Sequence, residues 1–113
     1  MKAVLSFLCA IGIGLAPVLV QAKTGRCVLQ VNTKTFLDGP CEIKLNDKQG
    51  SFSIGAGDSH RSKYFAYVRM DDDGAHGYWN ETPDATHAHA DLGILKRDGA
   101  CWKNDTARVC AYK

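Results

Sequence analysis

The chain has 113 residues, of which 45% are hydrophobic, 23% charged and 9% aromatic, and 14 Lys and Arg stand against 12 Asp and Glu. This length allows one ordinary domain, and the apolar content excludes a disordered chain. The formal charge of +2 excludes a nucleic-acid binder that neutralises phosphates, because such a protein needs a basic excess on one face.

Residues 1–22 have the layout of a secretory signal peptide. Lys2 gives a positive start, residues 3–20 carry no charge, and a site for cleavage follows at Ala22. The alternative is a membrane anchor, since the apolar run just reaches the length of a span, but two glycines and a proline interrupt it. We therefore expect one mature domain over residues 23–113, periplasmic or secreted, with no stable membrane span after cleavage.

Cysteine usage supports the exported compartment. Cys9 falls in the expected signal peptide, which leaves Cys27, Cys41, Cys101 and Cys110. An even number of cysteines in an exported chain implies two disulfides. In a domain this small, with a modest core, each is expected to contribute roughly 2–4 kcal/mol.

The mature chain has the pattern of an all-β domain. No stretch keeps helical spacing of apolar residues for three turns, and turn signals recur every ten residues or so. We expect an antiparallel sheet or sandwich of about six or seven strands, with at most one short helix. Residues 38–40 (Asp-Gly-Pro) are expected to form a turn at which Pro40 ends the pairing. The expected strands are 27–32, 34–36, 41–45, 51–54, 63–70, 77–79 and 92–96, followed by a hairpin over 99–113.

Strand alternation favours a disulfide between Cys27 and Cys41. If Leu45 faces Phe52, every inward position of that hairpin is apolar, and Cys41 lies on the same face as Leu45. Cys27 lies on the apolar face of the first strand. Both sulfurs then point toward the core, where they can meet.

The last hairpin favours the second disulfide, Cys101–Cys110. Setting these two cysteines opposite each other places Trp102 opposite Val109. One face of the hairpin is then apolar and the other carries the disulfide. Four cysteines permit three connectivities, and the two register arguments favour the one with two local bonds.

A His-x-His segment is the strongest sign of metal chemistry. On an extended segment His87 and His89 point the same way, and Asp91 continues the row, so that zinc or copper could bind. His60 or His76 could complete the ligand set. The alternative is a polar loop whose histidines bond to backbone carbonyls, and in that case no cofactor is expected.

The aromatic residues either fill the core or form an exposed platform. They include Tyr64, Tyr67, Tyr78, Trp79 and Trp102. We expect most of them in the core, and we expect Tyr78 or Trp79 to be exposed for binding a protein or a glycan.

The chain lacks a recognisable catalytic constellation, so we expect no enzyme. All mature cysteines are expected to be oxidised, which leaves no thiolate nucleophile, and serines near His60 in sequence do not make a triad. A small hydrolase is the alternative, and it would need His60, His76 or His89 to meet a carboxylate in a cleft.

Two asparagines stand in N-glycosylation sequons, Asn80-Glu-Thr82 and Asn104-Asp-Thr106. The pattern has meaning only in a host that glycosylates its exported proteins.

Six short motifs together resemble a family of small exported proteobacterial proteins without an assigned activity. They are Asp38-Gly-Pro-Cys41, Lys63-Tyr-Phe-Ala-Tyr-Val68, Gly77-Tyr-Trp-Asn80, His87-Ala-His89, Gly99-Ala-Cys-Trp102 and Val109-Cys-Ala111. The resemblance implies export and disulfides. In size, export and disulfides the chain is also similar to small periplasmic lysozyme inhibitors and to immunity proteins of the envelope. We therefore expect a non-enzymatic binding protein, such as an inhibitor or immunity protein.

Overall fold

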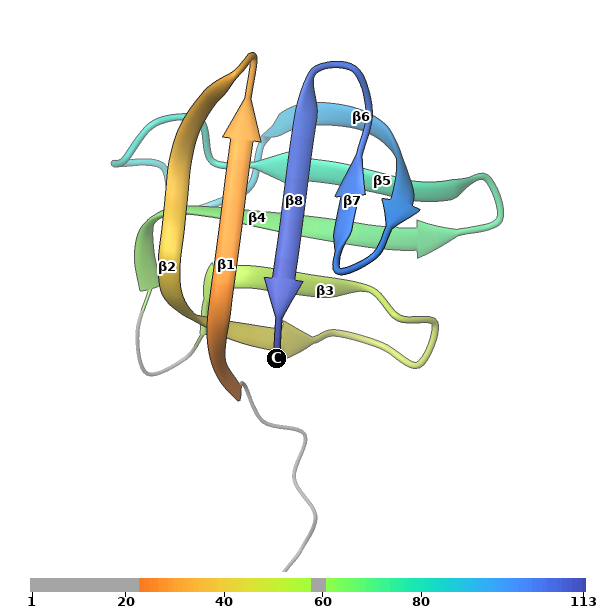
Figure 1. Ribbon diagram of the computed structural model, residues 1–113, viewed down its shortest axis with the longest axis horizontal. Coiled ribbons are helices and arrows are strands. Elements are labelled where there is room, and N and C mark those ends of the chain that lie inside the picture. Colours follow the sequence, from red (N-terminus) through yellow and green to blue (C-terminus); the bar gives the residue numbers. More distant parts are fainter. Residues whose placement is uncertain (1–22, 58–60) are drawn as a thin grey trace, which may run out of the picture.

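A computed structural model describes residues 23–57 and 61–113, which form a closed antiparallel barrel of eight strands. Each strand pairs with the next one in the chain, and β8 pairs with β1 (Figure 1). The strands are β1 (Lys23–Val31), β2 (Lys34–Leu45), β3 (Phe52–Ala56), β4 (Arg61–Asp71), β5 (Gly74–Trp79), β6 (Ala90–Asp98), β7 (Cys101–Lys103) and β8 (Ala107–Tyr112). The expected signal peptide and His60 lie outside the described residues.

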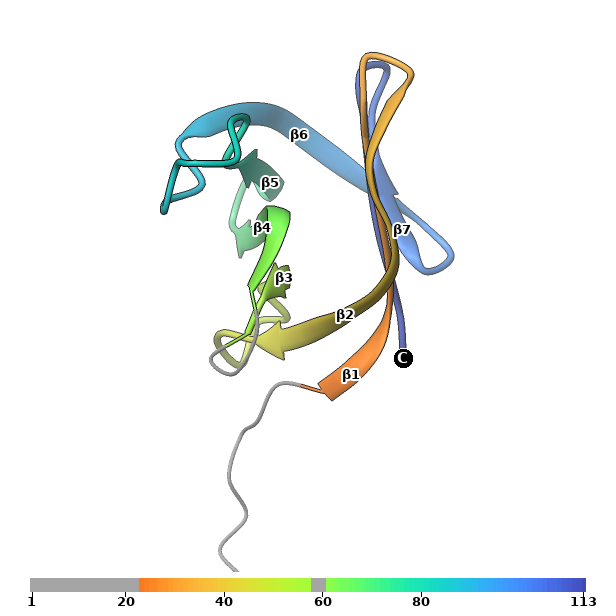
Figure 2. The ribbon, with the colours of Figure 1, turned by 90° about the vertical axis from the view of Figure 1, so that its left-hand side faces the viewer.

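The all-β prediction is confirmed, whereas an open sheet or sandwich of six or seven strands is wrong. Two strands cause the difference. The end of β2 pairs with β3 after the rest has paired with β1, and β6 pairs first with β5 and then with β7. Figure 2 shows both strands crossing between the layer of β1, β7 and β8 and the layer of β3, β4 and β5. Strands shared in this way turn two layers into one closed barrel.

The predicted turn at residues 38–40 is also wrong, because these residues lie within β2. Gly39 lies opposite Cys27, and Pro40 lies opposite Arg26. Since β3 pairs with β2 only from Ile43 onward, β2 is an edge strand at Pro40. An edge position tolerates proline, because the missing N–H can face away from the partner strand. Asp38 is held in the strand by an ion pair with Arg26.

Both predicted disulfides are confirmed, as are the strand registers that favoured them. Leu45 lies opposite Phe52, and Cys101 lies opposite Cys110. The Cys27–Cys41 disulfide lies in the core of the barrel. The Cys101–Cys110 disulfide is equally buried, although it lies on the other side of β8 from the core residue Val109.

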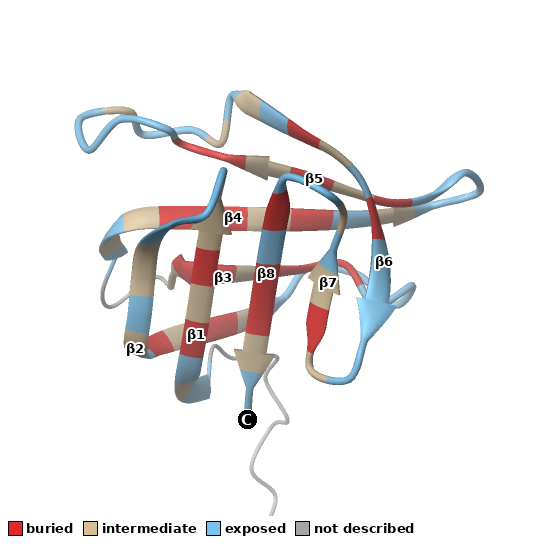
Figure 3. Cartoon of the chain, turned by 45° about the horizontal axis from the view of Figure 1, so that its top comes forward, coloured by how far each residue is buried: buried red, intermediate tan, exposed pale blue. Residues whose placement is uncertain are grey.

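Inward-facing side chains from several strands form the core of the barrel. Its most buried side chains are Leu29, Ile54, Val68 and Val109, from four different strands. Figure 3 shows buried positions concentrated on the strands, whereas the hairpin tips are exposed. The alternation of side chains along each strand therefore decides what lies inside.

Three aromatic rings close one end of the barrel. The ring centroid of Phe36 lies 4.6 Å from that of Trp79 and 5.0 Å from that of Tyr64. Trp79 is only 6% exposed. The expectation that most aromatic residues fill the core therefore holds at this end.

A buried asparagine joins β4 to the segment after β5. The side-chain oxygen of Asn80 accepts a hydrogen bond from the N–H of Phe65 at 3.0 Å. Its amide nitrogen donates to the carbonyl oxygens of Lys63 at 3.1 Å and Thr82 at 3.0 Å. This asparagine of the first sequon is fully buried, so its role in the fold is structural.

Among residues 23–57 and 61–113 there is no helix with the length and apolar character that a membrane crossing requires.

Removing either disulfide is expected to weaken the fold substantially. For Cys27→Ala with Cys41→Ala, and for Cys101→Ala with Cys110→Ala, we expect a loss of about 3 kcal/mol in the free energy of unfolding. The reason is that each bond closes a loop and so restricts the unfolded chain. Denaturant unfolding of each double variant measures the loss, and a loss below about 1 kcal/mol would contradict the prediction.

Replacing Asn80 by alanine is expected to cost about 3 kcal/mol, because a buried N–H and two carbonyl oxygens lose their partner. Thermal and denaturant unfolding measure the effect. A matched control is Asn46→Ala, which removes an exposed side-chain bond to Ser53 and should cost little. Equal losses for the two variants would show that the buried bonds are not what stabilises this region.

Candidate functional site

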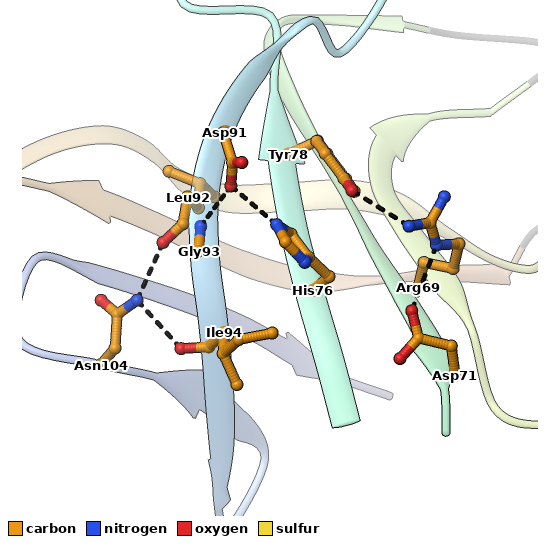
Figure 4. Close-up of polar contacts among 9 residues, drawn as sticks. All are labelled: Arg69, Asp71, His76, Tyr78, Asp91, Leu92, Gly93, Ile94 and Asn104. Carbon is orange, nitrogen blue, oxygen red and sulfur yellow. Dashed lines mark hydrogen bonds and ion pairs between the residues drawn. The ribbon is translucent and has the colours of Figure 1, made fainter. Parts of the chain in front are cut away.

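An outward-facing cluster of aromatic and charged side chains lies on β4, β5 and β6. Tyr67 lies opposite Tyr78, and Arg69 lies opposite His76, which in turn lies opposite Ile94. Cross-strand neighbours point to the same side of a sheet, so these five side chains share one face. We call Tyr67, Arg69, His76, Tyr78 and Ile94 the outer aromatic face (Figure 4 shows all but Tyr67).

Stacking holds the rings of this face in fixed positions. The ring of His76 is stacked on that of Tyr78, with centroids 4.8 Å apart and an angle of 10° between the planes. Tyr67 stacks on Tyr78 from the neighbouring strand at 6.4 Å. Such pairs contribute stabilisation beyond that of buried area, and here they fix the positions of the three rings relative to one another.

Arg69 is held in place from two sides. Its Nη2 donates a hydrogen bond to the hydroxyl of Tyr78 at 3.2 Å, and its Nε lies 3.7 Å from Asp71. The guanidinium also lies over the ring of Tyr78, 5.5 Å from the centroid. One cation is thus presented on an aromatic surface with its orientation already set.

A histidine–aspartate pair borders the outer aromatic face. Nε2 of His76 lies 2.9 Å from Oδ1 of Asp91, and the same oxygen accepts a hydrogen bond from the N–H of Gly93 at 2.6 Å (Figure 4). The Gly93 N–H, and after it the contact with His76, lowers the pKa of Asp91 below its ordinary value. Both favour the charged carboxylate.

Asn104 supports the β6 edge of the outer aromatic face through hydrogen bonds to the backbone of β6. Its amide nitrogen donates to the carbonyl oxygens of Leu92 at 2.8 Å and Ile94 at 3.1 Å, where β6 leaves β5 to reach β7. Its side-chain oxygen accepts the N–H groups of Thr106 and Ala107. The sequence placed Asn104 in a sequon and in the turn of the last hairpin, residues 103–106, but did not indicate its bonds to β6. The following Asp-Thr pair is a local turn signal that could have indicated this capping role.

Ile94 completes the outer aromatic face with an apolar side chain. It is 46% exposed, and it lies beside His76. The face therefore combines aromatic, cationic and aliphatic groups on neighbouring strands, and the carboxylate of Asp91 lies at its border.

The prediction of an exposed Tyr78 or Trp79 is resolved by the strand register. Tyr78 points outward and is half-buried, whereas Trp79 points into the barrel. The predicted exposure of Trp79 is therefore wrong, because its side chain is buried, and a partner-binding role stays a prediction for Tyr78. Neighbours on a strand point to opposite sides, so only one of the two could be exposed.

The His-x-His segment forms a tight bend instead of an extended row. The N–H of His89 donates to the carbonyl oxygen of His87 at 3.0 Å, and both rings are exposed. Asp91 contacts His76, not either of these histidines. In the part of the chain that the structure describes, no group of three His, Cys, Asp or Glu side chains is placed to hold a metal ion. A zinc or copper site at His87, His89 and Asp91 stays a prediction that this arrangement does not favour.

His76 does meet a carboxylate, as the hydrolase alternative requires. The pair nevertheless lies on the outward face of the sheet, and one ring face of His76 is taken by Tyr78. A catalytic pair usually works in a cleft that excludes water and positions a substrate. The geometry is better suited to holding a surface rigid than to proton transfer.

Comparison with known proteins finds no matching family model, no similar curated protein and no similar solved structure.

The lowered pKa of Asp91 is testable in solution. The chemical shift of the Asp91 carboxyl carbon, followed by NMR, should show a titration midpoint at lower pH in the folded protein than in an unfolded peptide. In His76→Ala the midpoint should rise and still stay below the peptide value, because the Gly93 N–H makes the larger contribution. A midpoint at or above the peptide value would contradict the assignment.

The same shift has a consequence for stability. A carboxylate whose pKa is lowered by folding stabilises the fold above its unfolded pKa, and this contribution is lost as the pH falls through the folded value. The stability difference between the native protein and Asp91→Asn should therefore shrink on acidification.

Proposed function

We propose that this is a non-enzymatic binding protein that acts outside the cytoplasm, and that the outer aromatic face binds a partner protein. The observation that carries the proposal is the preformed cluster of Tyr67, Arg69, His76 and Tyr78. Tyrosine and arginine are enriched among the residues that dominate binding energy at protein interfaces. Side chains fixed before binding lose little entropy when a partner docks.

A protein is a better fit to this face than a glycan. Sugars bind by stacking on an open aromatic ring, but the ring of Tyr78 is already covered by His76 and by the guanidinium of Arg69. Arg69 and Asp91 give the face both signs of charge, which suits a partner with complementary charges. Exposed Ile94 adds apolar area beside them.

The two disulfides support a location in an oxidising compartment, such as the periplasm or the extracellular space. Within that setting, the resemblance to envelope inhibitors and immunity proteins suggests an enzyme as partner. A muramidase is the first to test.

Tyr78→Ala is expected to weaken partner binding by at least about tenfold, since an interface hot spot contributes 2 kcal/mol or more. The native protein is used to cross-link and identify a partner from envelope extract, and affinity is then measured with the purified partner. Arg108→Ala, at an exposed position of β8 on the other layer, is the control and should bind as the native protein does.

If Tyr78→Ala is folded and binds the partner with the same affinity as the native protein, this face is excluded as the binding surface. Failure to capture any partner, together with no effect on muramidase activity, would count against the binding function itself.

A further inference from the structure

The end of the barrel opposite the aromatic cluster contains a cavity. Its volume is about 390 Å³, within the range of roughly 300–1,000 Å³ that is typical of small-molecule sites. The strand ends identify the location: Phe36 and Tyr64 lie near the starts of β2 and β4, whereas Leu45 and Met70 lie near the ends of the same strands. The larger apolar side chains of the lining are Ile43, Leu45, Phe52, Met70 and Trp102, and Ala100 and Ala111 add smaller ones.

Positive charge borders this apolar interior. The charged side chains among the lining residues are Arg97 and Lys113, and Lys23 lines an adjoining hollow together with Lys113. Arg97 is positioned by a hydrogen bond from its Nε to the carbonyl oxygen of Gly99 at 3.1 Å, and its guanidinium lies 5.9 Å from the ring centroid of Trp102.

The acidic residue next to Arg97 does not cancel this charge. Asp98 is paired with Lys103, with 3.0 Å between the carboxylate and the ammonium nitrogen. Within residues 23–57 and 61–113 no carboxylate is paired with Arg97, and its Nη groups, unlike the Nε that donates to Gly99, are available at the mouth of the cavity.

One wall of the cavity is preorganised by a hydrogen-bonded loop. Gln49 and Gly50 line the cavity, and Oδ1 of Asp47 accepts hydrogen bonds from the N–H groups of Gln49 at 2.9 Å and Ser51 at 3.0 Å. Hydrogen bonding from Ser51 lowers the pKa of Asp47, so the carboxylate stays charged and holds the loop.

We infer that this cavity binds a small amphipathic monoanion of the fatty-acid class. The acyl chain would lie among Phe52, Met70 and Trp102, where burial of apolar surface favours binding. The carboxylate would bind Arg97 at the mouth, because a guanidinium matches the two oxygens of a carboxylate. Closed eight-stranded barrels are wide enough to hold one small ligand. The site is separate from the outer aromatic face, so either can fail without the other.

The probe for the first test is decanoate, with decanol and decyltrimethylammonium as matched probes of the same chain length. Calorimetric titration of the full mature protein should show saturable binding of decanoate below its micelle concentration, weaker binding of decanol and none of the cation. Decanoate should also change the fluorescence of Trp102, and this change should be absent in Trp102→Phe. Binding that appears only above the micelle concentration, or that is as strong for the cation, would overturn the inference.

Variants test the two halves of the site separately. Arg97→Gln should lower the affinity for decanoate about tenfold and leave that for decanol unchanged, since only the head group loses a charged partner. Ala111→Leu, which fills the cavity from β8, should abolish binding of both. Arg108→Gln, on the outside of β8, is the charge-matched control and should change neither. If Arg97→Gln and Arg108→Gln behave alike while remaining folded, Arg97 is not the recognition residue.

Discussion

Six paired positions between β1 and β8 join the first and last strands of the barrel and close it. This seam removes the free strand edges that an open sheet would expose. It also sets Leu29 opposite Val109, and both are fully buried. A disulfide lies on each side of the seam, because Cys27 links β1 to β2 and Cys110 links β8 to β7. The strands that close the barrel are therefore the ones that are covalently braced.

Closure makes the two ends of the barrel different. At one end Phe36, Tyr64 and Trp79 fill the interior with rings. At the other end the smaller side chain of Ala111 and the loop at Gly50 leave space. The end packed with aromatic rings makes the barrel rigid, and the other end has room for a ligand. One small barrel can therefore be both rigid and able to bind a ligand.

Local features were predictable from the sequence, and long-range ones were not. Alternation over two residues sets both the hairpin registers and the faces on which the cysteines lie, so the disulfides followed from short segments. The same alternation could not decide between Tyr78 and Trp79, because that depends on which side of β5 becomes the interior. Pairing through Pro40 and the bonds from Asn104 to β6 depend on other strands, which a local pattern does not identify. The sequence predicted an extended segment at the His-x-His motif. One local hydrogen bond, from the N–H of His89 to the carbonyl oxygen of His87, bends the chain there.

The outer aromatic face and the cavity share two strands, β4 and β6, but no side chain. Arg69 points outward to Tyr78, whereas the next residue, Met70, lines the cavity. The N–H of Met70 is itself fixed by the buried hydroxyl of Ser51 at 2.8 Å, which ties β4 to the loop that forms the cavity wall. A bound anion could be coupled to the outer aromatic face through the backbone of β4 or through that of β6, which carries both Ile94 and Arg97. Because backbone hydrogen bonds to neighbouring strands hold β4 and β6, we expect the two surfaces to act independently.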